Sequence, residues 1–140
     1  MNSFSLQLLS TTEQTQIEGV TSFVGEDASG SFGLLPGHGR LMTSLIFGLA
    51  RFRCGQAPWQ YLALPGALLY FVDNRLQIST RRYLLDEDYE RISHLLQQQL
   101  LAEENELQAM KESLRRMEDE VLRRLSELGQ DRAERLFGGH

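Results

Sequence analysis

Residues 30–39 read Gly30-Ser-Phe-Gly-Leu-Leu-Pro-Gly-His-Gly39, with four glycines and one proline around a short apolar core. Glycine adopts backbone conformations that side chains forbid, and proline fixes φ and removes a hydrogen-bond donor. The stretch therefore predicts a short strand, a tight turn and an exit loop. It lacks the Gly-Lys-Ser/Thr ending of a phosphate-binding loop, so its pattern does not indicate a nucleoside triphosphatase.

The apolar residues of this stretch are Phe32, Leu34 and Leu35. A strand that enters a Gly-Pro turn needs an anchor in a core, so we expect all three to be buried beside Trp59 and Phe71. More aromatic residues precede and follow the stretch and would supply the large apolar area that such a core needs.

Composition narrows the classes of function. The chain has 140 residues, 41% of them hydrophobic and 24% charged, and a net charge of −5, which suits one folded domain with an appendage. This acidic balance argues against nucleic acid as a partner. The single cysteine, Cys54, excludes an internal disulfide, and no His/Cys cluster suggests a metal site. No apolar run approaches the roughly 20 residues needed to cross a bilayer, so we expect no direct membrane insertion.

Glycine and proline divide the chain into two parts. All three prolines lie before residue 66, and residues 67–128 contain neither glycine nor proline. This predicts a β-rich first part, an all-β sandwich domain over residues 1–82, and a helical domain over residues 83–129. We expect Gly129 to stop the helix and residues 130–140 to form a frayed tail. Strands are predicted at residues 4–9, 17–24, 32–35, 45–53, 59–64, 67–72 and 75–80.

The helical part carries two apolar stripes at steps of three and four residues. The first consists of Leu85, Tyr89, Ile92 and Leu96, and the second of Leu107, Met110, Leu114, Met117, Val121, Leu125 and Leu128. The stripes are out of phase, and the polar residues 102–106 lie between them. Two arrangements fit this pattern: an antiparallel helical hairpin that turns there, or one continuous helix with a slip in phase.

Residues 30–39 resemble the Gly-x-Leu/Phe-Gly-Ile/Leu-Leu-Pro-x-His signature of the ε subunit of rotary F-type ATP synthases. In that family an apolar stretch and a glycine follow the histidine, as residues 41–45 and Gly48 do here. Residues 59–80 are similar to the family's paired strands with a glycine turn, so the resemblance covers most of residues 4–91. It implies a flattened β-sandwich followed by a C-terminal helical hairpin.

The resemblance also implies a function. An ε subunit catalyses nothing itself; it sits in the central stalk between the γ subunit and the membrane rotor ring of c subunits, and couples ion-driven rotation to ATP synthesis or hydrolysis. Residues 31–40 would contact the ring and γ, through Ser31, Phe32, His38 and Arg40. The complex would lie on the cytoplasmic face of the plasma membrane. Residues 121–128 resemble the alternative, sodium-type branch (N-ATPases).

In the same family the C-terminal helices can restrain ATP hydrolysis. The resemblance implies contacts from this tail to acidic surfaces of the catalytic α and β subunits. The residues that would make them are Arg115, Arg116, Arg123 and Arg124. The alternative is that these arginines only support the exposed helix face through acids four residues away.

Some ε subunits bind one ATP through an Ile/Leu-Asp-x-x-Arg-Ala pattern. Asp88 and Arg91 reproduce its Asp-x-x-Arg, but Glu87 and Ile92 stand at the flanking positions. These departures favour a helix pair between Asp88 and Arg91, three residues apart, over ATP binding, and no other cofactor is indicated. For the whole chain, a second class of function is a freestanding β-domain interaction module whose tail dimerises as a coiled coil.

Overall fold

The computed structural model describes the backbone of residues 2–137, with the side chains of residues 2–130 and 132. Its strands are β1 (Phe4–Leu9), β2 (Gln14–Val20), β3 (Ser22–Asp27), β4 (Gly30–Leu34), β5 (Leu41–Leu45), β6 (Gly48–Arg53), β7 (Gln60–Leu64), β8 (Ala67–Val72), β9 (Arg75–Thr80) and β10 (Leu84–Asp86). They are followed by α1 (Tyr89–Leu95), the π-helical turn η1 (Leu96–Leu100) and α2 (Leu101–Phe137).

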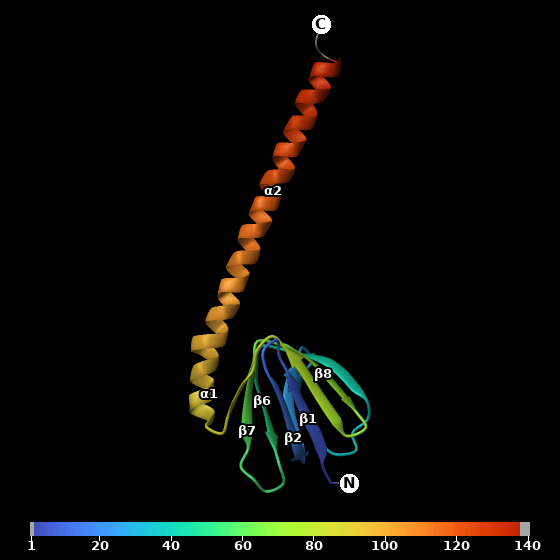
Figure 1. Cartoon of the computed structure of the whole chain (residues 1–140), viewed down its shortest axis with the longest axis vertical. Coiled ribbons are helices and arrows are strands. Elements are labelled where there is room, and N and C mark those ends of the chain that lie inside the picture. Colours follow the sequence, from blue (N-terminus) through green and yellow to red (C-terminus); the bar gives the residue numbers. More distant parts are fainter. Residues whose placement is uncertain (1, 138–140) are drawn as a thin grey trace. The chain divides into compact units, whose positions relative to one another are not determined.

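The strands form one curled sheet in the order β10-β7-β6-β3-β5-β8-β9-β1-β2, with β4 beside β3 (Figure 1). All pairs are antiparallel except β1 with β9. Strands β3 and β5 share only the residue pair Asp27–Leu45. The sheet therefore folds over at this junction into two layers, and the predicted β-sandwich is confirmed.

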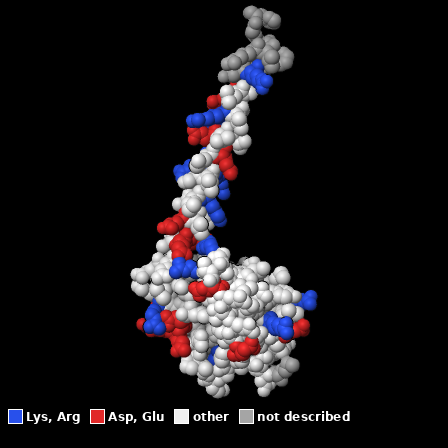
Figure 2. All heavy atoms as spheres, in the orientation of Figure 1, with Lys and Arg blue, Asp and Glu red and all other residues white. Residues whose placement is uncertain are grey.

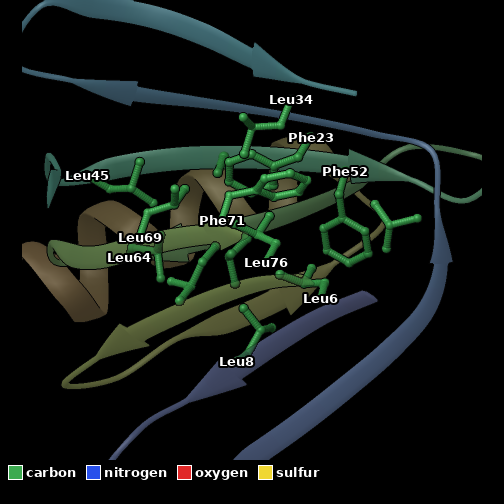
Figure 3. Packing of buried hydrophobic residues seen from close by; sticks show 14 of the residues in the cluster. Leu6, Leu8, Phe23, Leu34, Leu45, Phe52, Leu64, Leu69, Phe71 and Leu76 are labelled. Atoms are coloured by element: carbon green, nitrogen blue, oxygen red, sulfur yellow. The ribbon is translucent and has the colours of Figure 1, made fainter. Parts of the chain in front are cut away.

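The core lies between the layers and is built from alternate residues of both. Phe23 and Phe52 come from one layer, and Phe71, Leu6 and Leu8 come from the other (Figure 3). Strand side chains alternate between faces, and β1 shows it clearly, because Phe4, Leu6 and Leu8 are buried while the residues between them are half-buried. Burial of such side chains contributes about 1.5–3 kcal/mol each.

Some expectations from the sequence need correction. Leu34 and Phe71 are buried, Phe32 is half-buried against the core, and Trp59 is half-buried. Leu35, however, is 61% exposed, because β4 ends at Leu34 and the next residue belongs to the loop. Further, the predicted strands 17–24 and 45–53 are each divided, since Thr21 separates β2 from β3 and residues 46–47 separate β5 from β6.

A second, smaller cluster lies on the outer side of β6, β7 and β10. Leu49, Ala63 and Leu84 stand side by side on these strands, and Ile92 and Leu100 of the helical segment pack against them. The first stripe is therefore partly wrong, because Leu85 belongs to β10 and is exposed, and Tyr89 is exposed as well. Of the stripe only Ile92 is buried, together with Leu100. The segment up to Ala102 forms one compact unit with the sandwich.

Of the two helical arrangements, the structure has the continuous one. Helix α2 begins at Leu101 and runs through residues 102–106 without a turn (Figure 1). The change in phase occurs earlier, in η1, where the π-helical turn adds residues to one turn of the helix. Gly129 does not stop the helix, which continues to Phe137; residues 138–140 of the predicted frayed tail lie outside the described part.

Candidate functional site

The loop that follows β4 is held in one conformation by its own backbone. The N–H of His38 donates to the C=O of Leu35 at 3.1 Å, and Gly37 between them has φ of +83°. Residues with a side chain rarely adopt that backbone conformation, so a glycine is needed here. The ring nitrogen Nδ1 of His38 lies 2.7 Å from the C=O of Gly39. The loop thus presents Leu35, His38 and Arg40 as exposed side chains.

Asn74 anchors this loop to the opposite strands. Asp73 and Asn74 form the two-residue β8–β9 turn and both have positive φ, at 49° and 57°, as a type I′ hairpin turn requires. The side-chain Oδ1 of Asn74 accepts a hydrogen bond from the N–H of Gly37 at 2.7 Å, and its C=O accepts one from the N–H of Ser5 at 3.0 Å. We did not predict this role, although Asp-Asn is a turn signal in the sequence.

A surface hollow of about 330 Å³ lies between the loop and this turn, lined by residues 37–40 and 72–74. The His38 ring stands edge-on to Phe71, with the ring centroids 5.9 Å apart. Since Phe71 is a fully buried core residue, His38 is supported from below by the core. The loop is a fixed surface feature with an apolar residue, an imidazole and a guanidinium facing outward.

The other two predicted contact residues lie elsewhere. Ser31 is exposed near the β3–β4 turn, whereas the His38 loop follows the far end of β4. At about 3.3 Å per residue, the strand separates them by roughly 10–13 Å. Ser31 instead lines a hollow of about 300 Å³ with Glu26, Arg51, Tyr61 and Tyr89. Phe32 points toward the core, so the structure brings together only His38 and Arg40 of the four.

Asp88 and Arg91 are both engaged inside the chain. Asp88 is the N-cap of α1 and accepts from the N–H of Arg91 at 3.2 Å. The guanidinium of Arg91 binds Asp86 in a bidentate manner, with Nε–Oδ2 at 2.5 Å and Nη2–Oδ1 at 2.7 Å. The guanidinium of Arg91 therefore pairs with Asp86, and not with Asp88 as the helical spacing predicts. ATP binding through Asp88 and Arg91 stays a prediction.

The ion pair shifts the pKa of both partners. Hydrogen bonds from Arg91 and from the N–H of Asp88 hold the pKa of Asp86 well below its usual range, and the carboxylate raises the pKa of Arg91. The Asp86 side chain is only 11% exposed, whereas that of Arg91 is 64% exposed. The pair joins β10 to the start of α1 and so ties the helical segment to the sheet.

Replacing Asp86 with Asn should lower the melting temperature at neutral pH and weaken its dependence on acid. The pKa of Asp86 is lower in the folded chain than in the unfolded chain, where it is about 3.9. The ionised carboxylate therefore stabilises the fold fully above about pH 3.9, and this stabilisation is lost as the pH falls toward the pKa of the folded state. Thermal melts of both chains at about pH 7 and pH 2.5 measure this. The matched control is Glu87→Gln, which removes a neighbouring charge; equal deficits of Asp86→Asn at both pH values would contradict the assignment.

The four arginines of the tail lie on α2 within the second compact unit, residues 103–140. Acidic and basic side chains alternate along this helix (Figure 2). Arg124 Nη2 pairs with Glu120 Oε1 at 3.0 Å, four residues earlier, and Arg116 Nη2 lies 3.5 Å from Ser113 Oγ. Contacts of Arg115, Arg116, Arg123 and Arg124 with catalytic subunits stay a prediction.

Among the described residues, no three His, Cys, Asp or Glu side chains are grouped to hold a metal ion. Within the same part of the chain, no helix has the length and apolar character needed to cross a membrane.

The β-sandwich is also found in known proteins. The family model described as ATP synthase, Delta/Epsilon chain, beta-sandwich domain matches residues 3–85. The chain belongs to this family. These residues include β1 to β9, the His38 loop and its Asn74 anchor, and they end before α1, so the match leaves out the helical part of the delta/epsilon-family chain.

Individual relatives agree with the family. The delta/epsilon-family chain is 41% identical over 83 residues to the ATP synthase epsilon chain 2 of Cereibacter sphaeroides, an alignment that covers 59% of this chain and 57% of the relative. The chain thus matches little more than half the length of that relative.

Two solved structures share the fold. One comes from the Euglena gracilis mitochondrial ATP synthase (OSCP/F1/c-ring, rotational state 1), with 19% identity, a TM-score of 0.57, and coverage of 69% of this chain and 63% of the other. The other comes from the Tetrahymena thermophila mitochondrial ATP synthase (central stalk/c-ring), with 11% identity, a TM-score of 0.51, and coverage of 59% and 66%.

Proposed function

We propose that the chain is the epsilon subunit of the central stalk of a rotary ATP synthase, at the cytoplasmic face of the plasma membrane. It catalyses no reaction itself and couples rotation of the c-subunit ring to ATP synthesis or hydrolysis. The observation that carries this proposal is the 41% identity over 83 residues, 59% of this chain, to a protein named ATP synthase epsilon chain 2.

The His38 loop is the part that we assign to the ring and the γ subunit. Its backbone is fixed by Gly37 and by the Asn74 side chain, so little conformational entropy is lost when a partner binds it. Leu35 supplies exposed apolar area, and His38 and Arg40 supply polar contacts beside it. An apolar centre with a polar rim is the usual composition of a protein interface.

We assign a restraining role to α2. Its apolar stripe is exposed in the chain alone, and such a stripe needs a partner. In the complex, the γ, α and β subunits supply one, and Arg115, Arg116, Arg123 and Arg124 pair with their carboxylates. A tail bound in this way would oppose the rotation that hydrolysis drives.

The experiment is to express the complex with a tagged γ subunit and with altered forms of this chain. The amount of the Leu35→Asp variant recovered with γ and the ring should be at least about tenfold lower than that of the unaltered chain. A loss of about 1.4 kcal/mol in binding free energy lowers affinity tenfold, and an unpaired charge buried in an interface costs more than that. Its matched control is Ile46→Asp, another exposed apolar residue that follows β5 rather than β4. Absence of the unaltered chain from the purified complex would refute the proposal.

A second arm of the same experiment uses a chain that ends at Ala102, the limit of the first compact unit. This chain should join the complex as well as the full chain, because the His38 loop is intact. ATP hydrolysis by the complex should rise, because the restraining tail is gone. Hydrolysis at the full-length rate would show that α2 has no restraining role and would leave the assignment to the stalk standing.

A further inference from the structure

The apolar stripe of α2 has an unusual internal order. Its members are Leu107, Met110, Leu114, Met117, Val121, Leu125 and Leu128, so the steps are three, four, three, four, four and three. From Met110 onward these side chains are 55–64% exposed. Leu114, Met117 and Val121 lie together in the middle of this stripe and form an open apolar surface. A stripe of this length exposes enough apolar surface to require a partner.

The order of the stripe reads almost the same in both directions. If a second helix runs antiparallel with its centre beside Met117, Leu107 lies level with Leu128, Met110 with Leu125, and Leu114 with Val121. Antiparallel coiled coils pack an a position of one helix against a d position of the other, in layers three and four residues apart. The two consecutive steps of four residues around Val121 are a stutter, a break in the heptad repeat. Because of this break, the d positions before the stutter lie level with the a positions after it in the second copy.

Charges on the edges of the stripe fit the same pairing. In this register, Glu106 lies beside Arg124 of the second copy along one edge. Along the other edge, Glu118 lies beside Arg115 of the second copy. Two-fold symmetry repeats both pairs, giving four contacts between opposite charges. Edge charges of this kind set orientation and partner choice in coiled coils.

A parallel pairing fits less well. The stutter places Glu118 next to Met117 in the central layer, at the border of the stripe. Parallel helices in register would put the Glu118 carboxylates of both copies side by side, and like charges repel. The antiparallel pairing places Glu118 against Met117 of the second copy, where the carboxylate can reach Arg115.

We propose that α2 is a self-association surface, and that two free copies of this chain pair through it as an antiparallel coiled coil with its two-fold axis beside Met117. The proposal goes beyond the function in the complex and concerns the subunit on its own. The dimer uses the same stripe that α2 offers to other subunits, so a copy that is paired in this way cannot at the same time bind them through α2.

Sedimentation equilibrium of the full chain should show a reversible monomer–dimer equilibrium. The orientation is tested by cross-linking with a short thiol-reactive reagent in a Cys54→Ser background. Met117→Cys should cross-link to itself, and Leu107→Cys should not, because Leu107 lies level with Leu128 of the second copy. Adding Leu128→Cys to Leu107→Cys should restore the cross-link. Glu112→Cys, on the opposite face of α2, is the control for random collision.

Charge reversal gives an independent test of register. Glu106→Lys and Arg124→Glu should each raise the dissociation constant several-fold, and the double variant should return it toward the original value. Circular dichroism checks that the helix persists, since Arg124→Glu also removes the contact with Glu120. Three results would each overturn the proposal. The chain could remain monomeric at every concentration, or Leu107→Cys could cross-link on its own. Lys111→Glu could also rescue Glu106→Lys, which would indicate parallel helices.

Discussion

Replacing Leu34 with Ala is expected to lower the free energy of unfolding by about 2–5 kcal/mol. Leu34 is fully buried at the end of β4, where it stands opposite Phe23 of β3 and packs in the core between the layers (Figure 3). The shortened side chain leaves a cavity that both layers surround, so the site has little freedom to collapse. Urea denaturation of the two chains measures the difference.

The matched control is the next residue. Leu35 has the same side chain but is 61% exposed, so Leu35→Ala should change the free energy of unfolding by no more than about 0.5 kcal/mol. Equal losses for the two variants would show that the loop, and not the core, limits stability at this point of the sandwich.

A fragment that ends at Ala102 is expected to fold cooperatively, and a fragment that ends at residue 82 is expected to remain largely unfolded. The shorter fragment lacks Tyr83, whose hydroxyl lies 2.6 Å from the Thr15 hydroxyl and whose ring is buried in the main core. It also lacks β10 and the buried residues Ile92 and Leu100. Losses of about 1.5–3 kcal/mol for each buried side chain add up to a large share of the 5–15 kcal/mol that stabilises a typical domain.

Amide NMR spectra of the two fragments decide the matter. We expect well-dispersed amide signals from the fragment of residues 1–102 and poorly dispersed signals from the fragment of residues 1–82. A dispersed spectrum from the shorter fragment would show that the helical segment only rests on a sandwich that is already complete. The boundary at residue 82 that the sequence suggests would then be a folding boundary after all.

The sequence predicts the sandwich well because alternation and turn residues are local signals. Phe4, Leu6 and Leu8 mark β1 by period alone, and Asp73 and Asn74 mark the turn after β8. The prediction fails where a local pattern has two meanings. Leu85 and Ile92 are compatible with one helical stripe, but pairing with β7 places Leu85 in a strand. The Leu and Gln residues of η1 carry no sequence signal that would predict a π-helical turn.

The candidate site was predictable in part. The glycines and proline of residues 30–39 indicate a fixed loop, and the loop is there. Its anchor, the Asn74 side chain, comes from a position 37 residues along the chain from Gly37, and no spacing rule connects the two. The family resemblance groups Ser31 with His38 in one contact region, but the extended strand β4 separates the two residues. Likewise, Arg91 was paired with Asp88 by helical spacing, while Asp86 lies before the helix and binds the guanidinium.

The fold-over between β3 and β5 has a mechanical consequence. Along each layer, neighbouring strands are joined by ladders of hydrogen bonds, but the two layers meet through the single ladder pair Asp27–Leu45. A force that slides one layer over the other is therefore resisted mainly by interlocking side chains such as Phe23, Phe52 and Phe71. Close-packed interiors have low compressibility and transmit strain. In the rotating stalk proposed above, the sandwich would behave as a stiff block whose resistance to shear depends on how well these rings fill the space between the layers.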